Sequence, residues 1–387
     1  MLIPLITFPY LIRVLGKELY GLVIFAQAII GYLLILVGLG FNVSATKKVS
    51  IYRNDKNKLN EIFSSVLILK SFLFFISLII LAFLLIYIPR THGYEALFLL
   101  SMTICINDIL FPSWYFLGIE KMKYITYLTL ISRLTFMILI FFIIKKPSDY
   151  IWVPAIYGIG YILSGVISFY IIFVKHNLKF YFQPIKTLKV YLFDSFPIFL
   201  SNVSVIVYIS TNKVLTGAIL GMEQVAYYDL AEKIITVLKT PISILGTTLF
   251  PKFNHDKNIG FAKKMLVISI AGNILLGILT VIFSKDIVLM LGGKSMEHAY
   301  HIVDILAITI PIIATSNILV LSMLLPFNKE RSILFIVVTS ALLYITSISL
   351  LTLLNRFTLI NISILIVFIE LYVTIISIVI CKKHQII

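Results

Sequence analysis

The chain has 387 residues, of which 60% are hydrophobic and only 13% are charged, and its mean hydropathy is +1.06. A water-soluble domain of this size cannot bury so much apolar side chain, so the composition excludes one and indicates a membrane protein. The formal net charge of +15 does not indicate nucleic-acid binding, because the basic residues are scattered between apolar runs and form no long tract.

The beginning of the chain does not read as a cleavable signal peptide, because Pro4, Pro9 and Arg13 do not fit the expected order of charged, apolar and small residues. The first apolar segment, residues 1–12, is too short to cross a bilayer alone. We therefore expect a first helix that is truncated at its start. A re-entrant first segment is the alternative.

Apolar stretches of membrane-spanning length then recur, separated by short polar links. The period-two pattern of a membrane barrel is absent, so each stretch is predicted to be a helix and the fold class to be all-α. Each of the twelve segments except the first is near the roughly 20 residues that a bilayer core requires. They are residues 1–12, 20–44, 62–88, 95–118, 124–144, 151–174, 196–219, 226–250, 264–284, 302–325, 332–354 and 358–381.

The positions of lysine and arginine predict the orientation of the chain. If the amino terminus is cytoplasmic, most basic residues of the links fall in cytoplasmic links and in the tail, as do Lys47, Lys189 and Lys383. Because cytoplasmic loops are enriched in lysine and arginine, both termini are predicted to be cytoplasmic. A missed span would invert every later link, so the same bias supports the number of helices.

The longest internal link, residues 176–195, mixes basic and aromatic side chains and is predicted to lie along the cytoplasmic headgroups as an amphipathic segment. It separates two predicted six-helix bundles, residues 1–175 and residues 196–387. Six helices in each half give the halves the same orientation, as in transporters built from parallel repeats.

A weak internal repeat supports this division. The segments Leu15–Glu18 and Ala26–Ile29 are matched by Leu220–Glu223 and Ala231–Ile234 at one offset of 205 residues. Chance matches among small and apolar residues are the alternative.

Five cations fall inside the predicted spans, where a charge at the bilayer centre costs at least roughly 2.5–3.5 kcal/mol and should face a wet cavity or a partner. We interpret them as candidates for a cationic substrate cavity, with buried ion pairing as the alternative for each. They are Arg133, Lys70, Lys213, Lys233 and Lys239. Arg133 is the most informative, because arginine keeps its charge and its planar group suits phosphate. Its alternative is a pair with Asp108.

Carboxylates are fewer in the predicted spans. Asp108 and Glu370 are candidates for ion coupling, because a poorly hydrated carboxylate readily takes up a proton or a cation. The alternative interpretation pairs each of them with one of the five cations.

The sequence offers no signal for a metal, a cofactor or a catalytic domain. Cys105 and Cys381 lie far apart in apolar runs, and His298 and His301 have no further ligands nearby, so no disulfide or metal site is expected. No phosphate-binding glycine loop and no Gly-x-Ser-x-Gly turn occurs. No link is long enough to fold as a catalytic or nucleotide-binding domain. A transporter rather than an enzyme is therefore predicted.

One motif resembles a known family. The run Phe111–Tyr124, FPSWYFLGIEKMKY, resembles the Pro-x-Trp-aromatic-aromatic-x-Gly-x-Glu-x-Met signature of O-antigen flippases. These are bacterial translocases of polysaccharide repeat units in the multidrug/oligosaccharidyl-lipid/polysaccharide exporter superfamily. Residues 4–21, 195–202 and 231–234 resemble the first, seventh and eighth helices of that family. Leu117 departs from the pattern, which has Gln there, so no role is carried over to it.

The resemblance implies two six-helix bundles around a cationic central cavity. It implies an undecaprenyl-pyrophosphate-linked oligosaccharide as substrate, flipped from the cytoplasmic to the periplasmic leaflet of the bacterial inner membrane for O-antigen or capsule-type polysaccharide synthesis. Membrane lipid, a polysaccharide polymerase and a chain-length regulator are the expected partners. Candidate sugar contacts, each with packing as the alternative, are Trp114, Tyr115, Asn202, Tyr208 and Asn212.

Three other functions are weighed against this one. A polytopic enzyme such as an O-antigen polymerase is the first, but the short outer links disfavour it. A cation-coupled drug exporter of the same superfamily is the second. A structural membrane scaffold is the third, and the charges inside the spans argue against it.

Overall fold

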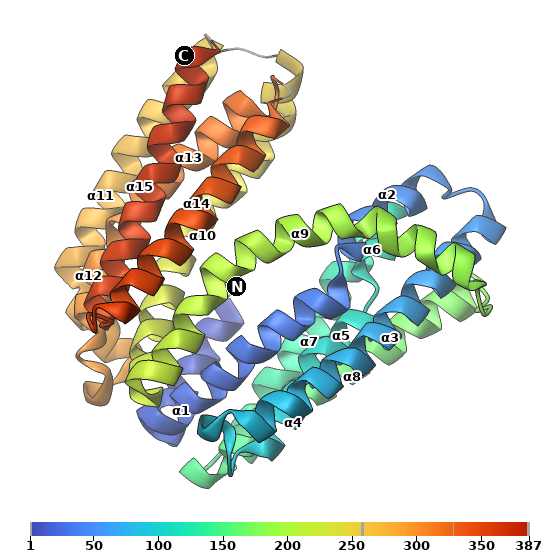
Figure 1. Ribbon diagram of the computed structural model, residues 1–387, viewed down its shortest axis with the longest axis horizontal. Coiled ribbons are helices and arrows are strands. Elements are labelled where there is room, and N and C mark those ends of the chain that lie inside the picture. Colours follow the sequence, from blue (N-terminus) through green and yellow to red (C-terminus); the bar gives the residue numbers. More distant parts are fainter. Residues whose placement is uncertain (1, 257–258, 328, 385–387) are drawn as a thin grey trace. The chain divides into compact units, whose positions relative to one another are not determined.

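The computed structural model describes residues 2–256, 259–327 and 329–384, and it describes side chains there except at 2–5, 201–202, 204–209, 242–256, 259, 262 and 330. In these ranges every regular element is helical (Figure 1). Nine helical stretches in the described part of the chain are long and apolar enough to cross a membrane. This confirms the predicted all-α polytopic membrane protein.

The contacts divide the chain into two compact units, Leu2–Ile206 and Val207–Ile387. We call them the amino-terminal and the carboxy-terminal unit and describe each by itself. Their boundary falls inside the long helix α9 (Ile185–Leu215). The division into two bundles of six helices each stays a prediction.

The amino-terminal unit is built from helices that pack mostly against their neighbours in sequence and against α1. Its elements before α9 are α1 (Leu2–Gly38), α2 (Phe41–Ile51), α3 (Lys56–Tyr87), η1 (Pro89–Thr91), α4 (Glu95–Ser101), α5 (Thr103–Leu110), α6 (Ser113–Gly118), α7 (Met122–Ile143), η2 (Pro147–Ile151), α8 (Trp152–Tyr170) and η3 (Ile171–Lys175). The first predicted segment and most of the second, which runs to residue 44, lie in one kinked helix, α1; the end of the second lies in α2. The kink of α1 is at Gly16, whose φ of 76° is a backbone conformation that favours glycine.

Glycines bring α8 close to two neighbours. A Cβ at Gly158 would lie 2.7 Å from Cγ2 of Thr103 in α5, and one at Gly160 would lie 2.7 Å from the carbonyl oxygen of Ser132 in α7. Small residues are how membrane helices gain van der Waals contact without a hydrophobic driving force. This close packing places the polar side chains of α5, α7 and α8 beside one another.

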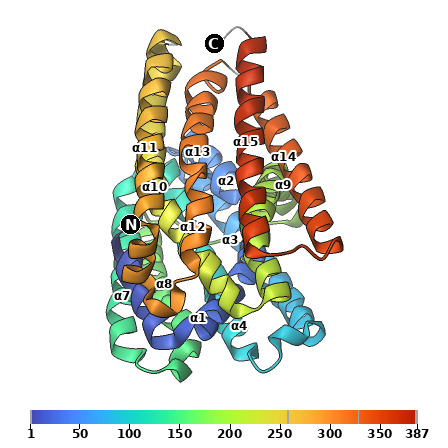
Figure 2. The same ribbon diagram turned by 90° about the vertical axis from the view of Figure 1, so that its left-hand side faces the viewer.

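The carboxy-terminal unit begins with the end of α9. It continues through η4 (Thr216–Leu220), α10 (Met222–Asp256), α11 (Ile259–Gly292), η5 (Lys294–Met296), α12 (Ala299–Ala307), α13 (Thr309–Ile318), η6 (Leu319–Leu324), α14 (Glu330–Leu353) and α15 (Leu359–Lys383). Helices α11, α13 and α15 run alongside one another, and α14 packs on α15 (Figure 2). Helices α9 and α10 are not among the nine stretches; α9 carries the half-buried Lys213 and α10 the buried Asp229. With them and the kinked first segment, the described helices fit the predicted set of about twelve.

Candidate functional site

A polar cavity of about 340 Å³ lies among α1, α5, α7 and α8 of the amino-terminal unit. Arg133 reaches it from α7, together with Asn107 from α5 and Tyr157 and Tyr161 from α8. No described side chain lies within ion-pair or hydrogen-bond distance of the Arg133 guanidinium, which is exposed. The cavity therefore offers a positive charge that no described side chain neutralises.

Aromatic rings form one wall of this Arg133 cavity. The Phe136 and Tyr157 rings stack with centroids 3.6 Å apart and planes 15° apart, and the Tyr157 and Tyr161 rings follow at 6.0 Å and 22°. A flat aromatic surface beside a guanidinium can contact the apolar face of a sugar ring while the cation binds an anion. Tyr157, Tyr161 and Asn107 were not singled out from the sequence. Their only signal there is that the tyrosines stand four residues apart, next to Gly158 and Gly160.

Lys70 in α3 is paired within the same unit. Its Nζ lies 2.7 Å from Oδ2 of Asp108 and donates a second hydrogen bond to the Asp108 carbonyl oxygen at 2.9 Å. The Lys70 side chain is only 2% exposed. The pair of Arg133 with Asp108, left open as an alternative by the sequence, does not form. The charge of Lys70 is already neutralised.

In the carboxy-terminal unit, Lys213 and Lys233 belong to one ion-pair network. Nζ of Lys213 lies 2.8 Å from Oδ1 of Asp229 and 2.6 Å from Oε2 of Glu232. Nζ of Lys233 lies 2.8 Å from the other Asp229 oxygen, and the Asp229 side chain is only 1% exposed. Two lysines thus meet two carboxylates. This network has no net charge to offer a substrate.

Lys239 lies near that network in a smaller cavity of about 250 Å³, which Glu232, Glu370 and Asn212 also line. Lys239 is close enough to Glu370 and Glu232 to interact with both electrostatically. Asn212 is held in place, because Tyr344 donates a 2.6 Å hydrogen bond to its Oδ1 and its Nδ2 donates to Tyr228 at 3.1 Å. Because Glu232 is already paired with Lys213, the other charged groups of this cavity are Lys239 and Glu370, which together carry no net charge.

Trp114 and Tyr115 lie in the hydrophobic core and line neither cavity. Their rings contact the Phe63 ring, at centroid distances of 5.9 and 6.2 Å. Gly118 lets α6 lie against α2, because a Cβ there would be 2.6 Å from Val49. The motif from Phe111 to Tyr124 therefore packs helices together. Asn202 and Tyr208 lie outside the described side chains.

His176, which the sequence did not indicate, joins this motif. Its Nδ1 lies 3.1 Å from Oη of Tyr115 and its Nε2 3.2 Å from Nζ of Lys121. A lysine ammonium only donates, so Nε2 accepts and the Nδ1–H donates to Tyr115. Burial lowers the pKa of His176, and the charges of Lys121 and Lys175 lower it further.

Similarity to known proteins covers most of the chain. The sequence model of a family described as "Polysaccharide biosynthesis protein" matches residues 1–257. A "Putative O-antigen transporter" of Escherichia coli (strain K12) is 25% identical over 88% of this chain and 84% of its own length.

Several solved structures share the fold. An inward-facing multidrug resistance MATE family transporter of the MOP superfamily has a TM-score of 0.78 at 12% identity and covers 99% of this chain and 94% of its own. The lipid II flippase MurJ, in an inward closed conformation, has a TM-score of 0.76 at 16% identity and covers 98% of this chain and 85% of its own.

Proposed function

Because this chain belongs to the polysaccharide biosynthesis protein family, we propose that it flips a lipid-linked oligosaccharide across the bacterial inner membrane. The substrate is an undecaprenyl-pyrophosphate-linked repeat unit, which moves from the cytoplasmic to the periplasmic leaflet for O-antigen or capsule-type polysaccharide synthesis. No bond is made or broken, so the protein is a transporter and not an enzyme. A relative named as an O-antigen transporter and a fold shared with a lipid II flippase support this proposal.

The observation that carries the proposal is the guanidinium of Arg133, which lies in a polar cavity and has no ion-pair partner among the described residues. The substrate presents a diphosphate and a sugar chain, both of which are costly to place in hydrocarbon, while its polyprenyl tail is at home there. A planar guanidinium can hold two phosphate oxygens at once. Tyr157 and Tyr161 then offer ring faces to the sugar, and the tail stays in the lipid.

The other membrane charges have different roles in this proposal. Glu370 takes up the coupling proton or cation, in the cavity that Lys239 also lines. Asp108 is the second coupling candidate, because its protonation would release Lys70. Alternating access between the two bundles moves the headgroup without opening a pore. Both termini lie on the cytoplasmic side, which fits the distribution of basic residues.

Flipping is tested with purified protein in liposomes that contain a fluorescent lipid-linked oligosaccharide. The proposal expects the protein alone, without nucleotide, to move the fluorophore from the leaflet that a membrane-impermeant quencher reaches. Protein-free liposomes give the background rate. An absolute requirement for ATP, or no flipping by folded protein, would contradict the proposal. Recovery of a lengthened saccharide would instead support a polymerase.

A further inference from the structure

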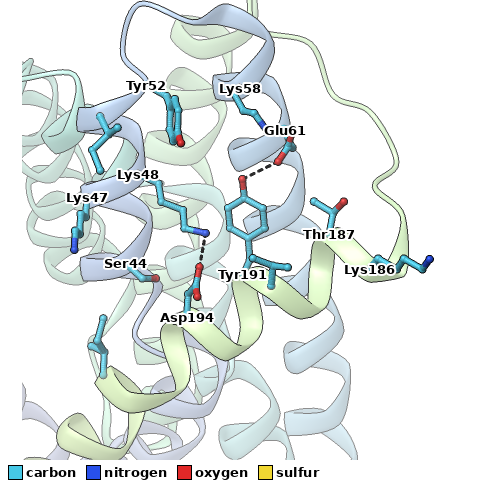
Figure 3. Close-up of a pocket in the computed structure, with 13 residues that line it drawn as sticks. Ser44, Lys47, Lys48, Tyr52, Lys58, Glu61, Lys186, Thr187, Tyr191 and Asp194 are labelled. Atoms are coloured by element: carbon cyan, nitrogen blue, oxygen red, sulfur yellow. Dashed lines mark hydrogen bonds and ion pairs between the residues drawn. The ribbon is translucent and has the colours of Figure 1, made fainter.

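A second polar cavity of the amino-terminal unit has a volume of about 770 Å³ and lies where the ends of α2, α3 and α9 meet. It has no lining residue in common with the Arg133 cavity. Four lysines and two carboxylates line it, namely Lys47, Lys48, Lys58, Lys186, Glu61 and Asp194. Figure 3 shows the contacts among them.

Both carboxylates are already bound by lysine. Lys48 lies 2.6 Å from Asp194, and its ammonium stands 4.0 Å from the centroid of the Tyr191 ring. Lys58 lies 2.8 Å from Glu61, and Tyr191 donates a 3.2 Å hydrogen bond to the other Glu61 oxygen. This network links α2, α3 and α9, so the wall of the cavity is held in place by its own charges.

Lys47 and Lys186 remain without an ion pair among the described residues. They stand on opposite sides of the cavity and extend away from the paired groups (Figure 3). A lysine side chain has four rotatable carbon–carbon bonds, so each ammonium can turn toward a ligand. After the two internal pairs are subtracted, these two lysines give the cavity a net positive charge. A diphosphate esterified at both ends, as in a lipid-linked saccharide, has two ionised oxygens and matches that charge.

Apolar side chains on the same lining favour an amphiphilic ligand over a soluble one. Ile51 and Val190 line the cavity and are exposed, and the neighbouring Ile185 at the start of α9 is exposed as well. A lipid tail can lie against such side chains while its headgroup meets the lysines. Inorganic pyrophosphate carries the same charged group but would gain nothing from this surface.

We propose that this cavity binds the diphosphate headgroup of a membrane-borne prenyl lipid, with Lys47 and Lys186 as its phosphate contacts. The ligand's identity as the transported lipid-linked oligosaccharide rests on the proposed function. The cavity then holds the substrate at the ends of α2, α3 and α9 before its diphosphate reaches Arg133. Tyr52 and Thr187 also line the cavity, where their hydroxyl groups can contact the first sugar.

The test is lysine footprinting of the full-length protein in lipid vesicles, with farnesyl diphosphate as the membrane-borne probe. With the probe at about ten times its dissociation constant, acetylation of Lys47 and Lys186 should slow about tenfold. Lys56 and Lys189 are matched internal controls, because they are exposed lysines on α3 and α9 that do not line the cavity. Their acetylation should not change. Equal protection of all four lysines, or of none, would overturn the proposal.

Two further arms separate the sources of the ligand and the two proposals. Inorganic pyrophosphate should protect Lys47 and Lys186 much less than farnesyl diphosphate does, and equal protection would refute a lipid ligand.

The double variant K47Q/K186Q should weaken binding of farnesyl diphosphate about tenfold, whereas K56Q/K189Q should not. Protection is read without transport. If farnesyl diphosphate protects these lysines but the protein does not flip lipid, the binding site in this cavity stands and only the proposed function is refuted. If the protein flips lipid but the lysines are not protected, only the binding site in this cavity is refuted.

Discussion

The Arg133 cavity and the Lys213 network differ in whether carboxylates of the protein neutralise the positive charge. Around Lys213, two lysines face two carboxylates at 2.6 to 2.8 Å, and Asp229 at the centre is buried. Arg133 has no carboxylate partner among the described residues and lies open in its cavity. A closed network lowers the cost of its own charges in the membrane, whereas an unpaired cation leaves that cost to be met by a ligand or by water. The number of cations in the membrane spans therefore overstates the number of positive charges that are available to bind a substrate.

The largest expected effect is at Arg133. Arg133→Ala should abolish surface polysaccharide and leave the protein inserted at normal abundance, because no described carboxylate is left without its partner. Losing two charge-assisted hydrogen bonds of about 1.5–3 kcal/mol each predicts a drop in flipping of at least about 100-fold. Arg133→Lys should retain part of the function, because the charge survives and the bidentate fork is lost. Polysaccharide staining measures the surface polysaccharide, and quantitative immunoblotting measures the abundance of the protein.

The opposite pattern is expected at Asp229. Asp229→Ala removes the carboxylate that both Lys213 and Lys233 contact. Breaking a buried pair from one side costs roughly 3–5 kcal/mol in soluble analogues, so the yield of folded protein should collapse. Size-exclusion yield and thermal unfolding in detergent measure this loss. Normal stability of Asp229→Ala would remove the distinction between the two regions.

The sequence was sufficient for the helices but not for the pairing of charges. Long apolar runs have one stable form in a membrane, so the spans could be read directly, and even the break between residues 12 and 20 appears as the kink at Gly16. That Asp108 pairs with Lys70 rather than Arg133 depends on how α3, α5 and α7 pack. Residues 38 positions apart carry no local signal of such a contact. The same holds for His176, which is 61 positions from Tyr115.

A smaller effect is expected in the motif that packs α6 on α2. Gly118→Ala would place a Cβ 2.6 Å from Val49 and 3.0 Å from the Thr46 carbonyl oxygen. Overpacking of this kind costs typically 1–3 kcal/mol. Gly272→Ala in α11 is the matched control, because nothing lies within 4 Å of a Cβ there. Equal melting temperatures for the two variants would show that the close approach of α6 and α2 is not needed.

The smallest expected effect is a pH dependence at His176. Its pKa is lowered in the folded protein by burial and by Lys121 and Lys175, so the unfolded chain binds the proton more readily. The stability that the neutral imidazole provides is complete above the unfolded pKa of about 6.5. It is lost as the pH falls from there through the lower folded pKa. His176→Gln should reduce the change of the melting temperature with pH between about pH 5 and 7. An unchanged slope would contradict this assignment.

The most direct test of the difference between paired and unpaired cations is the flipping rate in liposomes per folded molecule. Two variants are compared with the unmodified protein: Arg133→Gln, and the charge-neutral double variant Asp229→Asn with Lys233→Gln, whose residues pair with each other and do not line the Lys239 cavity. We expect Arg133→Gln to fold normally and to flip at least about 100-fold more slowly. The double variant should lose yield but flip at nearly the normal rate per folded molecule. Normal flipping by Arg133→Gln, or equal loss of rate in both variants, would contradict the account.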